Sequence, residues 1–213
     1  MSRPMVELKP LPHGRHGLSR EEVEASQRYR LAKAMADAMA EKGYARTTVA
    51  DIISRARVSR ETFYTLFRSK EDCFMHAFEE AYRHVFDAAA NRLAGGGQGL
   101  VRVDARELLD QVLRDYLEAL AAEPQTARVF LIEVYAAGGP ALARRRELMG
   151  DLVAGLAAYL GLASDEERFA LEAYLAAVVQ LVTTRLAADD PQGVRELHGP
   201  LVALAERMLL ARA

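Results

Sequence analysis

The stretch VSRETFYTLFRSKEDCF, residues 58–74, decides the fold of the N-terminal part of this chain. Read as a helix, it places Phe63 and Phe67 one turn apart on the same face, which is the spacing of side chains that pack into a core. The other face carries polar side chains: Arg60, Thr62, Tyr64 and Thr65. An ordinary amphipathic surface helix has the same periodicity, so the pattern alone leaves the role of the polar face open.

The bulk composition is that of a globular protein able to bury a sizeable core, with 51% apolar and 27% charged residues in a chain of 213. No apolar run approaches the roughly 18 residues that span a bilayer, and the N-terminal residues lack the apolar segment of a signal peptide. The single cysteine, Cys73, excludes an internal disulfide and fits a reducing compartment. We therefore expect a cytoplasmic protein.

Charge is distributed unevenly along the chain. Residues 1–75 carry 14 Lys and Arg against 10 Asp and Glu, a net charge of +4, whereas residues 76–213 carry 14 against 20, a net charge of −6. A basic end on an otherwise acidic chain indicates a surface that meets a polyanion. A chance fluctuation among surface charges is the alternative.

Residues 1–18 hold three prolines, two glycines and a scatter of basic side chains, without hydrophobic periodicity. The segment is predicted to be a flexible basic arm. Arms of this kind can lie along the minor groove of DNA, where arginine is attracted to narrow A·T-rich segments. The alternative is a solvated tail that binds nothing.

Start signals for three short helices follow the arm. Ser19 and Glu22 form the pattern of a capping box, and the helix that they open ends at Gly43. Thr48 and Asp51 are a plausible capping pair for the second helix, and Ser59 is a good N-cap for the third.

From Lys70 onward the pattern is helical almost to the end of the chain. Six helical segments are expected: from Lys70 to 93, from 104 to 122, from Pro124 to the AGGP of 137–140, from Pro140 to 161, from Ser164 to 188 and from 191 to 211. No strand alternation persists, so the predicted fold class is all-α. We divide the chain into the arm (1–18), a three-helix domain (19–69) and a larger helical domain (70–213).

The second and third short helices are separated by a turn of the length found in a helix-turn-helix. In that motif the second helix enters the major groove of DNA and presents its N-terminal residues to the base edges. Phe63 and Phe67 would then anchor this helix, while arginine can bond guanine and the hydroxyls of threonine or tyrosine can reach phosphates or bases.

The stretch GYARTTVADIISRARVSRETFYTLFRSKEDCF, residues 43–74, closely resembles the N-terminal DNA-binding domain of the TetR family of bacterial transcriptional regulators. The resemblance is carried by Gly43, Tyr44, Thr47, Thr48, Val49, Ile52, Ala56, Val58, Ser59, Thr62, Tyr64, Phe67, Lys70 and Glu71. It implies an all-α regulator, most commonly a repressor, that binds a palindromic operator as a dimer and is released by a small-molecule effector.

The resemblance also implies roles for individual residues. Phosphates would be bound by Thr47 or Thr48, by Tyr64, and by Lys70 together with the N-terminus of the fourth helix. Arg60, Glu61, Thr62 and Thr65 would lie where bases are contacted, and Ser59 is a further candidate DNA-binding residue.

Three positions depart from the family pattern. Arg57 occupies the turn where the family usually has glycine. Either a left-handed conformation there costs this non-glycine residue roughly 1 kcal/mol, or the turn differs slightly from that of the family. Leu66 replaces a residue that is frequently polar. Cys73 stands where leucine is usual, and we interpret it as a small buried hydrophobe.

The family's larger domain dimerises and binds the effector, but no motif identifies its sites in this sequence. The apolar segment 171–187 and the last helix are the expected dimer interface, with Leu175, Val178, Val179, Val182, Leu201 and Leu204 as candidates, although a fully buried central helix would look the same. Candidate pocket residues are Phe78, Tyr82, Phe86, Tyr116, Phe130, Glu133, Tyr135 and Tyr159, each of which also suits a core. Glu133 either lies on an exposed helix face or, if buried, needs a cation or a donor.

No motif for catalysis, a metal or a cofactor occurs in the sequence. The alternative functions are a helical ligand carrier and a helical enzyme that does not bind DNA. Both leave the basic N-terminal third and the polar helix face unexplained.

Overall fold

The structure, a computed structural model, describes residues 19–95 and 104–210, and for residues 84–95 it describes the helical backbone alone. The predicted basic arm therefore lies outside the described residues. Within those ranges the chain is helical and has no strand, which confirms the all-α prediction. The elements in chain order are α1 (Arg20–Arg46), α2 (Val49–Ala56), α3 (Arg60–Leu66), α4 (Lys70–Gly95), α5 (Ala105–Ala122), α6 (Pro124–Leu131), η1 (Glu133–Tyr135), α7 (Gly139–Leu160), α8 (Asp165–Ala187), α9 (Pro191–Glu196), α10 (His198–Ala205) and η2 (Glu206–Leu210).

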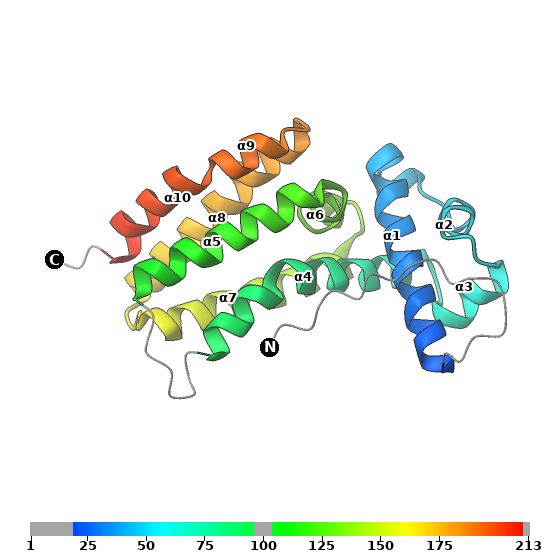
Figure 1. Cartoon of the computed structure of the whole chain (residues 1–213), viewed down its shortest axis with the longest axis horizontal. Coiled ribbons are helices and arrows are strands. Elements are labelled where there is room, and N and C mark those ends of the chain that lie inside the picture. Colours follow the sequence, from blue (N-terminus) through cyan, green and yellow to red (C-terminus); the bar gives the residue numbers. More distant parts are fainter. Residues whose placement is uncertain (1–18, 96–103, 211–213) are drawn as a thin grey trace.

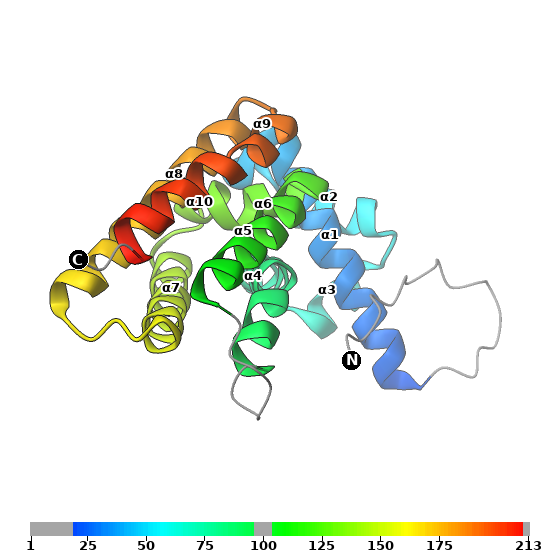
Figure 2. The ribbon, with the colours of Figure 1, turned by 60° about the vertical axis from the view of Figure 1, so that its left-hand side comes forward.

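The helices form two groups. Helices α1, α2 and α3 lie at one end of an elongated molecule, and α5 to α10 form a larger bundle at the other, with α4 reaching between them (Figure 1). Helix α1 also contacts α6 and η1, so the small group is in contact with the body along more than α4 alone. In the body, α8 and α10 run side by side along one edge (Figure 2).

Capping side chains begin most of the predicted helices. Ser19 and Thr48 each form a complete capping box, with Glu22 and Asp51 respectively, and Ser164 forms another at the start of α8. Each capping hydroxyl accepts a hydrogen bond from an N–H that has no partner inside its helix. The chain leaves helical geometry at Gly43 (φ 75°), where glycine carries no steric penalty.

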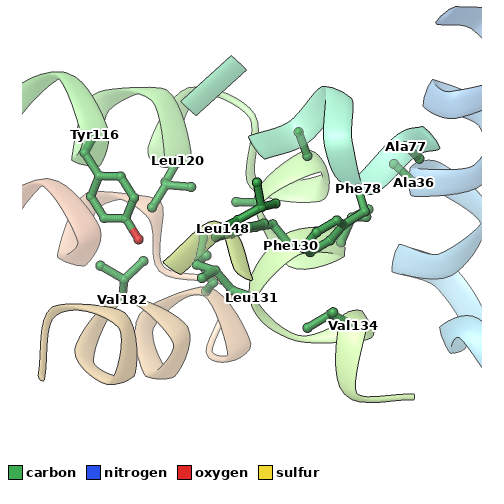
Figure 3. Close-up of a cluster of buried hydrophobic side chains, with 14 of the residues drawn as sticks. Ala36, Ala77, Phe78, Tyr116, Leu120, Phe130, Leu131, Val134, Leu148 and Val182 are labelled. Atoms are coloured by element: carbon green, nitrogen blue, oxygen red, sulfur yellow. The ribbon is translucent and has the colours of Figure 1, made fainter. Parts of the chain in front are cut away.

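One hydrophobic core runs through both groups. Figure 3 shows side chains of the core from Ala36 and Ala77, where α1 meets α4, to Tyr116 and Val182 in the body. Midway, Phe78 of α4 stacks on Phe130 of α6, with ring centroids 5.2 Å apart, and neither side chain is exposed to solvent. Because the two groups share this core, a displacement of α4 or α6 reaches α1 through packed side chains.

Two segments differ from the sequence prediction. The helix that starts at Pro124 ends early, at Leu131, and the chain continues through the 3₁₀ turn η1. The last predicted helix is divided into α9, α10 and the π-helical turn η2. Pro200 explains part of this division, because it has no N–H to donate to the carbonyl of Glu196 and so removes a helical hydrogen bond at the junction of α9 and α10.

Among the described residues, α8 is the one helix long and apolar enough to cross a membrane, on length and composition alone. This property was not expected from the length of the apolar runs in the sequence. A helix at the core of a soluble protein has the same properties, and one side of α8 packs against α6, α9 and η2. Its other side is exposed, which calls for another explanation of the apolar residues there.

Candidate DNA interface

Helix α3 is held in place by its aromatic side. Phe63 is fully buried, and the centroid of its ring lies 5.8 Å from that of Phe67. Arg28 of α1 reaches across to the end of α3: it donates a hydrogen bond to the carbonyl of Leu66 at 2.9 Å, and its guanidinium lies 5.2 Å from the centroid of the Phe67 ring. Leu66 itself is buried. The helix is therefore fixed to α1 by packing and by a hydrogen bond at its C-terminus.

The opposite side of α3 is exposed and polar. Arg60, Glu61 and Thr65 are exposed, Thr62 is half-buried, and the Tyr64 side chain is 48% exposed. The Arg60 guanidinium lies 5.5 Å from the centroid of the Tyr64 ring, a cation–π contact that aligns the two side chains on one face. The arrangement predicted from residues 58–74 is thus present, with the aromatic side turned inward and the polar side turned to solvent.

The turn between α2 and α3 has the left-handed residue that the sequence suggested. Arg57 has φ 53° and ψ 48°, a conformation that disfavours side chains with a Cβ atom. Ser59 then caps α3, its hydroxyl accepting a hydrogen bond from the N–H of Thr62 at 2.9 Å. Its hydroxyl also lies 2.9 Å from that of Thr62. The side chains of Ser59 and Thr62 therefore support the helix start while remaining near the surface.

The N-terminus of α4 lies beside the same surface. Ser69 accepts from the N–H of Asp72, and Asp72 accepts from the N–H of Arg68. The Lys70 ammonium donates a hydrogen bond to the backbone carbonyl of Tyr44 at 3.1 Å and lies 4.2 Å from the centroid of the Tyr44 ring. Burial and the nearby carboxylate of Glu71 raise the pKa of Tyr44 to about 12, so its hydroxyl stays protonated at neutral pH.

The two threonines at the start of α2 differ in accessibility. Thr47 is buried, and its hydroxyl donates to the carbonyl of Gly43 at 2.9 Å. Thr48 is exposed, and its hydroxyl donates to the carboxylate of Asp51. The Lys42 ammonium, 2.6 Å from the Asp51 carboxylate, and the bonds from Thr48 hold the pKa of Asp51 well below its usual value. Of the two threonines, Thr48 has the side chain that a phosphate can approach.

Several cations of this surface have no acidic partner within the part of the chain that the structure describes. Arg57, Arg60 and Arg68 are exposed, and none of the three forms an ion pair with another described residue. By contrast, Arg55 on the outer side of α2 is paired with Glu41. Unpaired cations around the start of α3 and the turn before α4 give this surface the positive charge that attracts a phosphate backbone.

The predicted pocket residues are not gathered around one cavity. Phe78 and Phe130 are fully buried in the core, Tyr82 and Tyr159 are half-buried, and Phe86 is a residue whose side chain is not described. Tyr116 lines a small apolar cavity of about 60 Å³, and Tyr135 lines a larger one of about 640 Å³ between α7 and α8.

Glu133 contacts the DNA-binding group instead of a ligand cavity. Its carboxylate accepts a hydrogen bond at 2.8 Å from the N–H of Tyr44, a residue 89 positions earlier in the chain. The side chain is half-buried. The donor that a buried Glu133 was expected to need is thus a backbone N–H at the broken end of α1.

Half of the predicted interface residues are buried inside the protomer. Val178, Val182 and Leu201 are buried, whereas Leu175, Val179 and Leu204 are half-buried. The exposed side of these helices carries other large apolar side chains, namely Phe169 (70% exposed), Leu181 (42%) and Met208 (38%). A partner chain would meet this second set.

Two contacts of the N-terminal group were missed by sequence reasoning. Neither the clamp of Arg28 on α3 nor the bond between Glu133 and Tyr44 has a local sequence signal, because each joins residues far apart in the chain. The clamp of Arg28 could be found only by predicting how α1 and α3 cross.

Comparisons with known proteins agree with this geometry. Residues 31–77 match the model of the bacterial regulatory proteins of the tetR family. No curated protein matches in a direct sequence search.

Solved structures with the same fold are distant in sequence. The fatty acid degradation regulator FadR from Bacillus halodurans is 22% identical, with a TM-score of 0.71 over 84% of this chain and 93% of that one. FadR from Bacillus subtilis, solved in complex with stearoyl-CoA, is 20% identical, with a TM-score of 0.71 over 83% and 96%. A TetR-like transcriptional regulator from Rhodococcus sp. RHA1 is 20% identical, with a TM-score of 0.64 over 92% and 100%.

These structures share the arrangement of a small N-terminal helical group on a larger helical body. The family match covers the anchor of α3, its polar face and the start of α4, which are the parts with a geometry suited to DNA. The helix-turn-helix, its exposed cations and this match identify residues 31–77 as the DNA-binding domain of the bacterial regulatory proteins of the tetR family, and the protein is a DNA-binding transcriptional regulator.

Proposed function

We propose that the protein is a cytoplasmic repressor that binds a near-palindromic operator as a homodimer and leaves it when a small molecule binds the body. The observation that carries the proposal is the polar face of α3, with unpaired cations, held on a fully buried aromatic anchor. A single helix of this length contacts too few bases for specificity, and a second copy on the next half-site supplies the rest.

Each exposed residue has a role in this proposal. Arg60, Glu61, Thr62 and Thr65 contact base edges, with Arg60 able to bond a guanine through two hydrogen bonds. Thr48, Ser59, Tyr64 and Lys70 position the helix on the phosphates. Lys70 already holds the carbonyl of Tyr44, so a phosphate bound there would share the ammonium with the end of α1.

The exposed apolar side chains of α8 and η2 form the proposed dimer interface. Phe169, Leu181 and Met208 are large side chains that a monomer would leave in water. A second copy of the same face, related by a two-fold axis, would cover them and place two α3 helices on one side of the dimer.

Besides the shared core, two hydrogen bonds to one backbone residue, Tyr44, connect the body and α4 to the end of α1. The N–H of Tyr44 is bound by Glu133 of η1, and its carbonyl is bound by Lys70 at the start of α4. A displacement of η1 therefore acts on the end of α1 and on the cation that faces DNA. We propose that the effector favours a dimer in which this shift has altered the spacing of the two α3 helices.

The small-molecule part of the proposal has support from a structural neighbour. FadR from Bacillus subtilis was solved in complex with stearoyl-CoA, so a protein of this fold can hold a small molecule. The present protein would then act by binding alone, without a catalytic step.

The experiment starts with selection of DNA fragments from the source genome by the purified protein. A bound fragment should show two related half-sites, and binding should weaken steeply as salt rises. Calorimetry with and without that fragment then tests release, because linkage requires DNA to weaken effector binding by the same factor as the effector weakens DNA binding. A protein that selects no fragment at low salt would instead be the helical carrier or enzyme.

A further inference from the structure

The larger cavity of the body is unusual in its charge. It has a volume of about 640 Å³, lies between α7 and α8, and is lined by Arg145, Arg146 and Arg168 together with one acidic residue, Glu172. Residues 76–213 as a whole carry a net charge of −6, so three arginines around one cavity run against the charge of the body.

The three arginines are not neutralised by any acidic side chain that the structure describes. None of them forms an ion pair among the residues that the structure describes, whereas the adjacent Arg144 is paired with both Glu79 and Glu147. The Nε atom of Arg145 is buried and has no hydrogen-bond partner within the same described residues. A buried N–H donor without an acceptor is costly, and an anion in the cavity would supply the acceptor.

The Arg145 side chain is oriented by an aromatic ring. Its guanidinium lies 5.4 Å from the centroid of the Tyr135 ring, which also lines the cavity. Burial raises the pKa of the Tyr116 hydroxyl, and the positive charge of Arg145 partly offsets that increase. Arg145 thus lines the cationic cavity, and its charge acts on Tyr116, which lines the apolar one.

The second cavity adjoins the first and has the opposite character. It is small, about 60 Å³, and its lining is apolar apart from the hydroxyls of Tyr116 and Tyr174. Met149 and Val179 line both cavities, so these two side chains form the boundary between them. Met149 can change rotamer readily, which would let an apolar chain pass from the wide cavity into the narrow one.

We infer that this pair of cavities is the effector site and that its ligand is an amphipathic anion. The anionic group, a carboxylate or a phosphate, binds Arg145 with Arg168 and Arg146 around it. The apolar chain passes Met149 toward Tyr116. Arginine suits this role because its planar donors match carboxylate and phosphate oxygens in pairs.

The location also explains how such a ligand would act, and this step rests on the proposed function. Tyr135 is in the same 3₁₀ turn as Glu133, which binds the N–H of Tyr44. A ligand that displaces Arg145 from the Tyr135 ring would therefore alter the turn that contacts α1.

The test is a calorimetric titration of the full chain, without DNA, with four ten-carbon probes below their micelle concentrations: decanoate, decyl phosphate, 1-decanol and decyltrimethylammonium. We expect one or both anions to bind about tenfold or more tightly than the alcohol, as one charge-assisted hydrogen bond implies. The stronger of the two anions identifies the head group. Equal binding of the alcohol, tighter binding of the cation, or no binding of either anion would overturn the inference.

Variants then locate the site. Arg145→Gln should weaken the anion by about tenfold or more and abolish the preference over the alcohol. Arg114→Gln, the matched control, removes the same charge from an exposed position on α5 that does not line the cavity, and should bind as the parent does. An unchanged affinity in Arg145→Gln would contradict the site.

Two further variants protect the test against misfolding. Arg168 and Ala154 are exposed lining residues, so Arg168→Gln and Ala154→Trp alter the cavity without disturbing the core. Arg168→Gln should weaken binding of the two anions and leave that of the alcohol unchanged, whereas Ala154→Trp should prevent binding of all four probes. These titrations contain no DNA, so they do not depend on the proposed function. If the parent protein failed to bind any operator, the proposed function would be contradicted and the titration results would stand. If the cavity variants bound the probes as the parent does, the site alone would be contradicted.

Discussion

Helices α3 and α8 both leave one side uncovered, but only the exposed side of α8 carries large aliphatic and aromatic side chains without a hydroxyl. The uncovered side of α3 carries Arg60, Tyr64 and Thr65, whereas that of α8 carries Phe169 and Leu181. A charged, hydroxyl-rich face gains little from an apolar partner and much from phosphates and base edges. Large exposed apolar side chains such as Phe169 and Leu181 gain from burial against another apolar surface. The difference supports the proposal that DNA binds at one end of the molecule and a second protomer at the other.

The largest expected effect separates the anchor of α3 from its exposed face. Phe63→Ala should lower the free energy of unfolding by about 3–5 kcal/mol, because a fully buried phenylalanine leaves a cavity. Tyr64→Ala, the neighbouring aromatic at 48% exposure, should change stability by only about 0.5 kcal/mol while weakening DNA binding. Urea unfolding measures both. Similar losses in the two variants would show that α3 has no inner and outer side.

The next effect concerns the apolar face of α8. Phe169→Glu and Leu181→Glu should each raise the dimer dissociation constant by about 30-fold or more, the consequence of losing at least about 2 kcal/mol at an interface. Tyr29→Glu provides the control, since Tyr29 is an exposed aromatic residue on α1, at 47% exposure. Sedimentation equilibrium distinguishes the outcomes. Dimers of unchanged stability in both α8 variants would place the interface elsewhere.

A smaller effect tests the contact between the two regions. Glu133→Ala should lower the free energy of unfolding by about 1–2 kcal/mol, because the N–H of Tyr44 loses a charged acceptor. Glu133→Gln keeps an oxygen in nearly the same place and should cost less. Thermal unfolding followed by circular dichroism gives the comparison. If alanine and glutamine have the same effect, the hydrogen bond is not what joins the body to α1.

The smallest effect concerns the turn before α3. Arg57→Gly should raise stability by about 0.5–1 kcal/mol, because glycine removes the left-handed strain at φ 53° and loses part of that gain to its greater freedom when unfolded. Arg57→Ala removes the same charge but keeps the Cβ atom, so its stability should stay close to that of the parent. Equal stability of the glycine and alanine variants would mean that the turn is not strained.

The sequence was sufficient where structure is determined by neighbours along the chain. The caps Ser19, Thr48 and Ser59, the break at Gly43 and the left-handed turn at Arg57 all depend on residues within about one helical turn. The buried and exposed sides of α3 follow from helical periodicity alone. These features define the DNA-binding end of the molecule, which is why its function could be predicted early.

The body was harder to predict because its features depend on contacts between distant residues. The end of α6 is followed by a turn whose Glu133 binds a residue 89 positions away. The cationic cavity joins Arg145 of α7 to Arg168 of α8, and no spacing rule connects them. Among apolar residues of α8, periodicity could not separate Val178 and Val182, which are buried, from Phe169 and Leu181, which are exposed, because the helix is apolar around most of its circumference.

The most direct test of the account compares Arg60→Ala and Lys70→Ala on a selected operator and on its single-base variants, across a salt series. Arg60→Ala should reduce the free energy of operator binding by about 1–3 kcal/mol and relax the base preference at one position in each half-site. Lys70→Ala should weaken all sequences alike and make the salt dependence shallower by about 0.9 for each phosphate that the protein no longer neutralises. If both variants bind every sequence as the parent does, at every salt concentration, then α3 is not the helix that contacts DNA.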